Sequence, residues 1–136
     1  MKKPFILFAI SFFTISLVSF QKQPFDLKAS VARGNDVYIS YCVSCHMDAG
    51  QGIEGIYPPL AKSGYLMADK NRAVLQVLHG MTGEIIVNGK TYNGEMTGFD
   101  LTDQEASDVV NYIRNSWGNK GAAVKPEEVR ALRNKE

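Results

Sequence analysis

The chain has 136 residues, of which 45% are hydrophobic and 21% are charged, and its formal net charge at pH 7 is +1. This length favours a single domain with a modest hydrophobic core. The near-neutral charge, without any run of Lys and Arg, argues against a nucleic-acid-binding protein.

Residues 1–20 are predicted to be a signal peptide. Lys2 and Lys3 precede an apolar run, Phe5–Phe20, which is interrupted only by serines and one threonine and is short for a membrane span. Because Val18-Ser19-Phe20 is a poor cleavage site, retention of this segment as a membrane anchor stays an alternative. In both cases the folded part is exported, which predicts a periplasmic location.

Removal of the signal peptide changes the charge of the protein. Without Lys2 and Lys3, 13 basic residues face 14 acidic ones, so the mature chain has a net charge of −1. Net charge alone therefore does not identify a partner.

Residues 21–28, which include Pro24, are polar and are predicted to form a linker. A helix is predicted over Ser30–Tyr41, where apolar residues recur at helical spacing. Gly34 lies inside this helix. Glycine costs up to about 1 kcal/mol relative to alanine there, which suggests close contact with another helix.

The next segment, Cys42-Val43-Ser44-Cys45-His46, is a C-x-x-C-H motif that predicts covalent attachment of a c-type haem. On one helical turn the two thiols and the imidazole share a face, so one segment can supply both thioether bonds and an iron ligand. A disulfide, a thioredoxin-like pair or half of a zinc site are alternatives. The chain has no other cysteine and only one other histidine, His79, which disfavours zinc.

The middle of the chain contains a loop, a helix and a hairpin. Gly50–Leu60, which has three glycines and two prolines, is predicted to be a loop. Asp69 or Asn71 can cap a helix that stops at Gly80. Met81–Asn93 contains Asn-Gly between β-prone residues, which predicts a small two-stranded hairpin with a primed turn.

Gly94–Phe99 is predicted to be a glycine-rich loop before the clearest helix of the chain. Thr102-Asp103-Gln104-Glu105 fits a capping box, and apolar residues follow at helical spacing up to Trp117. Residues 119–136 are polar and are expected to form a solvated tail, in which Pro126 can start one short helix.

The second axial ligand of the iron decides the chemistry of the site. Met96 is the favoured candidate because a flexible loop can place its thioether on the iron, and packing is its alternative role. His/Met ligation closes the iron to oxygen and favours electron transfer. The other candidates outside the signal peptide are Met47, Met67, Met81 and His79.

The order of these elements resembles a class I cytochrome c over residues 29–118. Gly34 and Tyr38 lie eight and four positions before Cys42, as the small and aromatic residues of the family do. The haem motif follows, and Pro58 and Leu60 lie twelve and fourteen positions after His46. A methionine loop and a last helix with an aromatic residue, Tyr112, complete the match.

The resemblance implies an all-α fold with short helices wrapped around one haem c and at most a small hairpin. It implies that Cys42 and Cys45 bind haem covalently and that His46 and Met96 are axial ligands. It also implies that the Pro58 carbonyl accepts a hydrogen bond from His46. Residues 87–96 are similar to small domains found beside copper nitrite reductases and terminal oxidases.

The predicted function is transfer of single electrons by an exported single-haem cytochrome, without enzyme activity of its own. The expected partners are a membrane quinol-oxidising complex and a terminal oxidase or copper nitrite reductase. Contact with a membrane is expected only if the N-terminal segment is retained. The alternatives are a haem enzyme or gas sensor with an open sixth site, and a thiol-disulfide oxidoreductase.

Overall fold

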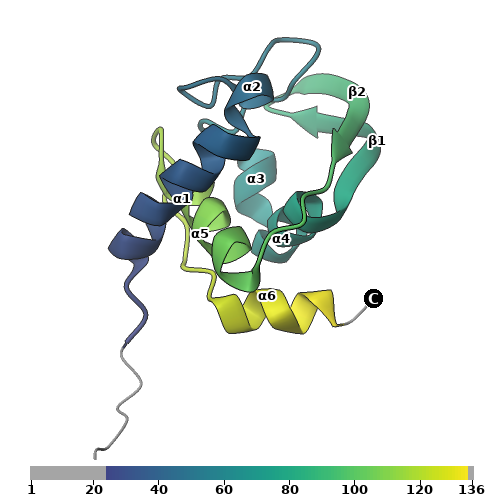
Figure 1. Cartoon of the computed structure of the whole chain (residues 1–136). Coiled ribbons are helices and arrows are strands. Elements are labelled where there is room, and N and C mark those ends of the chain that lie inside the picture. The colour runs from purple at the N-terminus through teal and green to yellow at the C-terminus, as the bar shows by residue number, and fades with distance from the viewer. Residues whose placement is uncertain (1–23, 135–136) are drawn as a thin grey trace, which may run out of the picture.

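The structure is a computed structural model that describes residues 24–134. Within these residues, the helices pack against one another and one small antiparallel sheet lies at their edge (Figure 1). The elements in chain order are α1 (Leu27–Tyr41), α2 (Val43–His46), α3 (Gly64–Ala68), α4 (Lys70–His79), β1 (Gly80–Val87), β2 (Lys90–Thr97), α5 (Asp103–Asn115) and α6 (Pro126–Arg133). The predicted helical fold with one hairpin is confirmed.

The predicted signal peptide, residues 1–20, lies outside the described residues. Among the helices of residues 24–134, none has the length and apolar character needed to cross a membrane. The first helix begins earlier than predicted, because the Asp26 carboxylate accepts a hydrogen bond from Ala29 N at 3.1 Å and caps α1. α1 therefore includes the last two residues of the predicted linker, residues 21–28.

α1 packs directly against α5, and glycine makes this contact possible (Figure 1). A Cβ atom on Gly34 would lie 1.9 Å from the Asp108 carbonyl oxygen, so only glycine fits at this crossing. Beside it, the rings of Tyr38, Tyr112 and Trp117 pack together with centroids 5.1 to 5.3 Å apart. The packing reason expected for a glycine inside this helix is confirmed.

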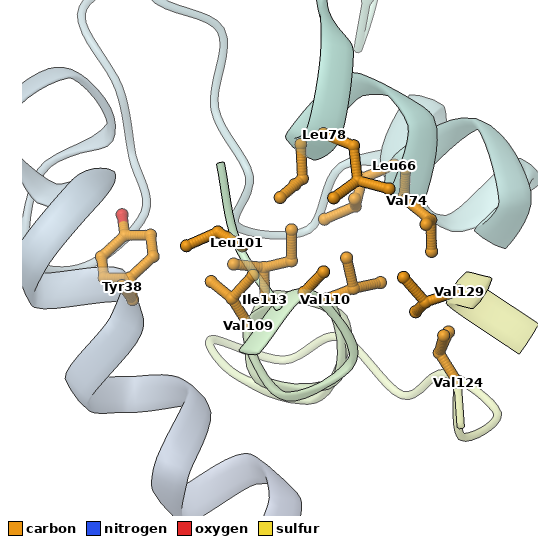
Figure 2. Close-up of a cluster of buried hydrophobic side chains, with 13 residues drawn as sticks. Tyr38, Leu66, Val74, Leu78, Leu101, Val109, Val110, Ile113, Val124 and Val129 are labelled. Atoms are coloured by element: carbon orange, nitrogen blue, oxygen red, sulfur yellow. The ribbon is translucent and has the colours of Figure 1, made fainter. Parts of the chain in front are cut away.

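α5 provides the centre of the hydrophobic core. Its predicted capping box is present: Glu105 N donates to Thr102 Oγ1 at 3.2 Å, and Thr102 N donates to Glu105 Oε2 at 2.9 Å. Figure 2 shows side chains of α5 between Tyr38 on one side and residues of α3 and α4 on the other. The buried apolar residues of α5 are Ala106, Val109, Val110 and Ile113.

The C-terminal segment corrects the sequence prediction. Residues 119–136 are not a solvated tail in their described part, because Val124 and Val129 are buried in the core. In Figure 2 both valines point toward α5. The Asn111 side chain donates to Val124 O and accepts from Val124 N, both at 2.7 Å. Two apolar residues are enough to pack this segment on the core. The average composition of the segment, which is polar, did not predict this.

α4 leads directly into the hairpin. Asp69 caps it by accepting hydrogen bonds from Asn71 N at 2.8 Å and Arg72 N at 3.1 Å. Gly80, with a φ of 79°, ends it as predicted, and it also begins β1, one residue before the predicted hairpin. The helix thereby fixes where the first strand starts.

The predicted hairpin is confirmed but is longer than expected. Asn88 and Gly89 both have positive φ, at 50° and 79°, as a type I′ turn requires. The pairing continues to Gly80 opposite Thr97. Residues up to Thr97 therefore belong to β2, and the predicted loop at Gly94–Phe99 is wrong for most of its length. The two-residue turn fixes the register, and β1 provides a partner for each of these residues.

Candidate haem site

The C-x-x-C-H segment forms one tight helical turn. His46 N donates to Cys42 O at 2.9 Å, and Cys45 N donates to the same carbonyl at 3.2 Å. Met47, with a φ of 62°, ends the turn. Both cysteines are half-buried and are not joined by a disulfide. The predicted arrangement of two thiols and an imidazole on one short segment is present.

A carbonyl of the following loop holds the imidazole of His46. His46 is 8% exposed, and its Nδ1 lies 3.0 Å from the Pro58 carbonyl oxygen, to which the protonated nitrogen donates. Burial lowers the pKa of His46, and the bond to Pro58 opposes this effect in part. The side chain is therefore held neutral with Nε2 left to bind a metal, in the orientation set by the carbonyl.

The loop that supplies Pro58 is itself fixed by backbone bonds. Gly52 N donates to His46 O at 3.0 Å, and Leu60 N donates to Gly50 O at 2.7 Å. Gly52 has a φ of 62°, and a Cβ there would lie 2.2 Å from the Tyr57 carbonyl oxygen. The glycines of this predicted loop thus allow the chain to fold tightly beside the histidine.

A cavity of about 600 Å³ brings the predicted site residues together. This volume is in the range of small-molecule and cofactor sites. The C-x-x-C-H segment and the loop after it line one side of the cavity with Cys42, Cys45, His46 and Pro58. The hairpin lines the other side with Met96. A smaller adjoining cavity of about 70 Å³ extends toward apolar residues of the core. The chain thus has a largely apolar space, with two thiols, an imidazole and a thioether, that fits a covalently bound haem.

The hairpin brings two methionines to this space. Met96 lies in a strand, not in the predicted loop, and is paired with Met81 of β1. Both side chains line both cavities. Of the other candidate ligands, Met47, Met67 and His79, none lines either cavity.

Met81 is a candidate ligand in the sequence, but Met96 is favoured over it, and its place beside Met96 was not predicted. Its signal was present in the sequence, because a two-residue turn at Asn88-Gly89 fixes which residues are paired along both strands. Directly opposed residues of an antiparallel pair have their side chains on the same face of the sheet. The turn therefore predicts that Met81 and Met96 are neighbours.

Some features of the cavity bear on the alternative functions. Burial raises the pKa of the Cys42 thiol to about 11, with a smaller contribution from Cys45, whereas a thiol-disulfide enzyme lowers the pKa of its attacking thiol. Glu95 is the one carboxylate among the described residues that line the cavity, and it is exposed. No cluster of three or more His, Cys, Asp or Glu suited to a metal ion occurs in residues 24–134.

Comparisons with known proteins find several relatives of this chain. A family model described as Cytochrome c matches residues 31–117. The chain is 40% identical over 119 residues to cytochrome c-552 of Thermus thermophilus, a match that covers 80% of each protein. It is 34% identical to the cytochrome c subunit of alcohol dehydrogenase (quinone) from Gluconobacter oxydans, over 74% of this chain and 22% of that subunit. It is 29% identical to the Cbb3-type cytochrome c oxidase subunit FixP of Bradyrhizobium diazoefficiens, over 76% of this chain and 36% of that subunit.

Proposed function

The chain belongs to the cytochrome c family, and on that premise we propose that it is an exported single-haem carrier of electrons between respiratory proteins. Members of this family bind haem c covalently, and the chain is an electron-transfer protein and not an enzyme. Its specific partners, its export and the roles of its site residues form the proposal.

Cys42 and Cys45 would form the thioether bonds to haem, and His46 and Met96 would bind its iron. The observation that carries this assignment is the single cavity that all four side chains line. The hydrogen bond from His46 to Pro58 supports it further, because it leaves Nε2 as the nitrogen that meets the iron.

When bound, haem supplies an iron that alternates between the ferric and ferrous states. Pro58 holds His46 and the strand pair holds Met96, so the chain would keep both side chains in place in either oxidation state of the iron. Two protein ligands leave no coordination position for oxygen. Apolar side chains along the cavity exclude water, which together with the thioether ligand raises the reduction potential.

The proposed electron donor is a membrane quinol-oxidising complex, and the proposed acceptor is a terminal oxidase or a copper nitrite reductase. Lys2, Lys3 and the apolar run after them support export to the periplasm. Two relatives support partners of both kinds. One is named as a subunit of a quinone-dependent dehydrogenase, which suits the electron donor, and the other as a subunit of a cbb3-type oxidase, which suits the acceptor. A carrier of this kind needs no substrate other than the electron.

The test is the visible spectrum of the ferric protein, matured in a host that attaches haem to C-x-x-C-H motifs. We expect the weak red charge-transfer band of a thioether sulfur bound to ferric iron. Met96→Ala removes most of this band. Met67→Ala is the matched control, because Met67 lines neither cavity, and it keeps the band.

The same preparation separates the alternatives. A protein that carries haem but lacks the band, and whose reduced form binds carbon monoxide at neutral pH, would be a haem enzyme or sensor. Alkylation of two thiols in the purified, denatured protein would instead indicate a thiol-disulfide oxidoreductase. The N-terminal sequence of periplasmic protein shows whether residues 1–20 are removed.

A further inference from the structure

The hairpin carries two thioethers to the cavity, although one iron position needs only one. Met81 and Met96 are directly opposed in the register of β1 and β2. In such a pair the Cβ atoms lie about 5 Å apart on the same face. Both side chains are half-buried and line both cavities. An unbranched side chain with three rotatable bonds can cover such a separation.

The sulfur of Met81 is engaged by a polar group of α4. Gln76 Nε2 lies 3.2 Å from Met81 Sδ and 2.9 Å from the Tyr65 hydroxyl oxygen. The amide can donate one N–H to each acceptor. All three residues line the smaller cavity, so this contact is made at the wall of the site and not on the outer surface. Since a thioether is a weak acceptor, the contact orients the sulfur and is readily exchanged for a stronger bond.

We propose that Met81 is a reserve ligand for the haem iron, and that Gln76 is the positioning residue that holds its sulfur aside while Met96 is bound. When the bond between Met96 and iron is lost, the Met81 sulfur leaves Gln76 and donates a lone pair to the iron. No proton or electron moves in this exchange. The inference rests on the proposed function, because it requires haem in the cavity and Met96 as the first ligand.

This arrangement gives the site a property that a single methionine does not. A lost Met96 bond would otherwise open the iron to water, oxygen or carbon monoxide. With a second thioether on the same face, the iron is closed again by a ligand of the same chemistry. The protein thus remains an electron carrier when a peroxide oxidises the Met96 thioether to the polar sulfoxide, transferring one oxygen atom to sulfur and leaving as water or an alcohol.

The experiment compares ferric spectra of wild type, Met81→Ala, Met96→Ala and the double variant, each normalised to covalently attached haem. Wild type and Met81→Ala are expected to have the same thioether band. Met96→Ala is expected to keep a weaker band that the double variant loses completely. Adding Gln76→Leu to Met96→Ala is expected to strengthen the residual band, because the Met81 sulfur no longer has its amide donor.

A second measurement does not depend on the folding of Met96→Ala. In the reduced protein, the haem ring current shifts the methyl signal of an iron-bound methionine far upfield in the proton NMR spectrum. Wild type is expected to show one such signal. Gln76→Leu alone is expected to add a minor second signal, which disappears in Gln76→Leu/Met81→Ala.

Identical spectra for Met96→Ala and the double variant would overturn the reserve ligand and leave the proposed function intact. An equal or weaker residual band after Gln76→Leu would overturn the positioning role of Gln76. Loss of the wild-type band in Met81→Ala would make Met81 the first ligand and overturn both this inference and the Met96 assignment. Absence of the band from wild type would contradict the proposed function itself.

Discussion

The two sides of the cavity differ in how they are built. The side with the C-x-x-C-H motif is continuous with the core: Tyr38 is 1% exposed, and its hydroxyl donates to the Met47 carbonyl oxygen at 2.7 Å. The other side is a two-stranded hairpin. Of its two eight-residue strands, only Val87 and Tyr92 are buried. One side is fixed by tertiary packing, and the other mainly by its own ladder of hydrogen bonds.

The two sides of the cavity should therefore differ in stability. Isolated two-stranded hairpins are marginally stable, and segments with few buried contacts open at low free-energy cost. The covalent bonds and the histidine are placed on the stable side, whereas the methionine is placed on the hairpin. We therefore expect the bond between methionine and iron to be lost well before the chain unfolds. Substitutions on the two sides should separate these events.

The largest expected effect is on the core side, at the crossing of α1 and α5. In Gly34→Ala the new Cβ would meet the Asp108 carbonyl oxygen at 1.9 Å, and a backbone atom cannot move aside as a flexible side chain can. We expect the free energy of unfolding to fall by about 3 kcal/mol. Guanidinium titration of the haem-loaded protein measures this change.

The matched control for that substitution is Gly64→Ala. A Cβ on Gly64 meets only the Asn88 side chain, at 3.8 Å, and Gly64 begins α3 without a positive φ. Its stability should be unchanged or slightly higher. A small effect at Gly34 as well would mean that α1 and α5 do not cross as closely as described.

The next effect in size concerns the C-terminal segment. Val129 is fully buried, so Val129→Ala removes two buried methyl groups and should cost about 2 kcal/mol of unfolding free energy. Ala131→Ser, at an exposed position of the same helix, should change it by less than about 0.5 kcal/mol. Because α6 packs on α4 and α5, we expect both folded variants to keep the wild-type thioether band in the absence of denaturant. If Val129→Ala were as stable as Ala131→Ser, residues 119–136 would be a solvated tail, as the sequence predicted.

Local signals in the sequence predicted much of the fold. Four predicted features depend only on residues close in sequence, and all four are present. They are the capping box of α5, the Asp69 cap, the Asn88-Gly89 turn and the C-x-x-C-H turn. Interactions between residues this close in sequence can be predicted without knowing the tertiary structure. The roles of the site residues toward haem remain predictions.

Long-range features were not readable in the same way. The buried Asp108 carboxylate accepts hydrogen bonds from Ser30 Oγ and from Arg33 Nε at 2.7 Å, across more than seventy residues of sequence. Val124 and Val129 are buried because they meet α5, which their polar surroundings do not indicate. Such pairs depend on how helices are placed in space, and no local propensity specifies this.

On the hairpin side, the largest effect is expected at the turn. The Asn88 side chain accepts from Gly64 N and donates to Lys62 O, both at 3.2 Å, and so fastens the turn to the chain before α3. Asn88→Gly keeps the positive φ but removes both bonds, at a cost of about 1 kcal/mol. Because imidazole must displace the methionine of the hairpin from the ferric iron, this loss of hairpin stability should tighten imidazole binding about fivefold.

Unfolding by guanidinium is the control for Asn88→Gly, because its midpoint should shift much less than in Gly34→Ala. A shift in that midpoint without any change in imidazole binding would mean that the hairpin and the core unfold as one unit. Asn88→Asp retains the acceptor for Gly64 N and loses the donor to Lys62 O, so it should lie between the wild type and Asn88→Gly.

The smallest effect is expected from the ion pair between Lys90 of β2 and Glu54, which joins the hairpin to the loop after the haem motif. Both side chains are exposed, and exposed pairs contribute little. The hydrogen bond to Glu54 raises the pKa of Lys90, so Lys90 stays protonated at neutral pH. Lys90→Met should tighten imidazole binding less than Asn88→Gly does, and only at low ionic strength, because salt screens exposed charges. Reversing both charges, Lys90→Glu with Glu54→Lys, should restore wild-type binding. An effect of Lys90→Met that persists in high salt would instead assign Lys90 a packing role over the cavity.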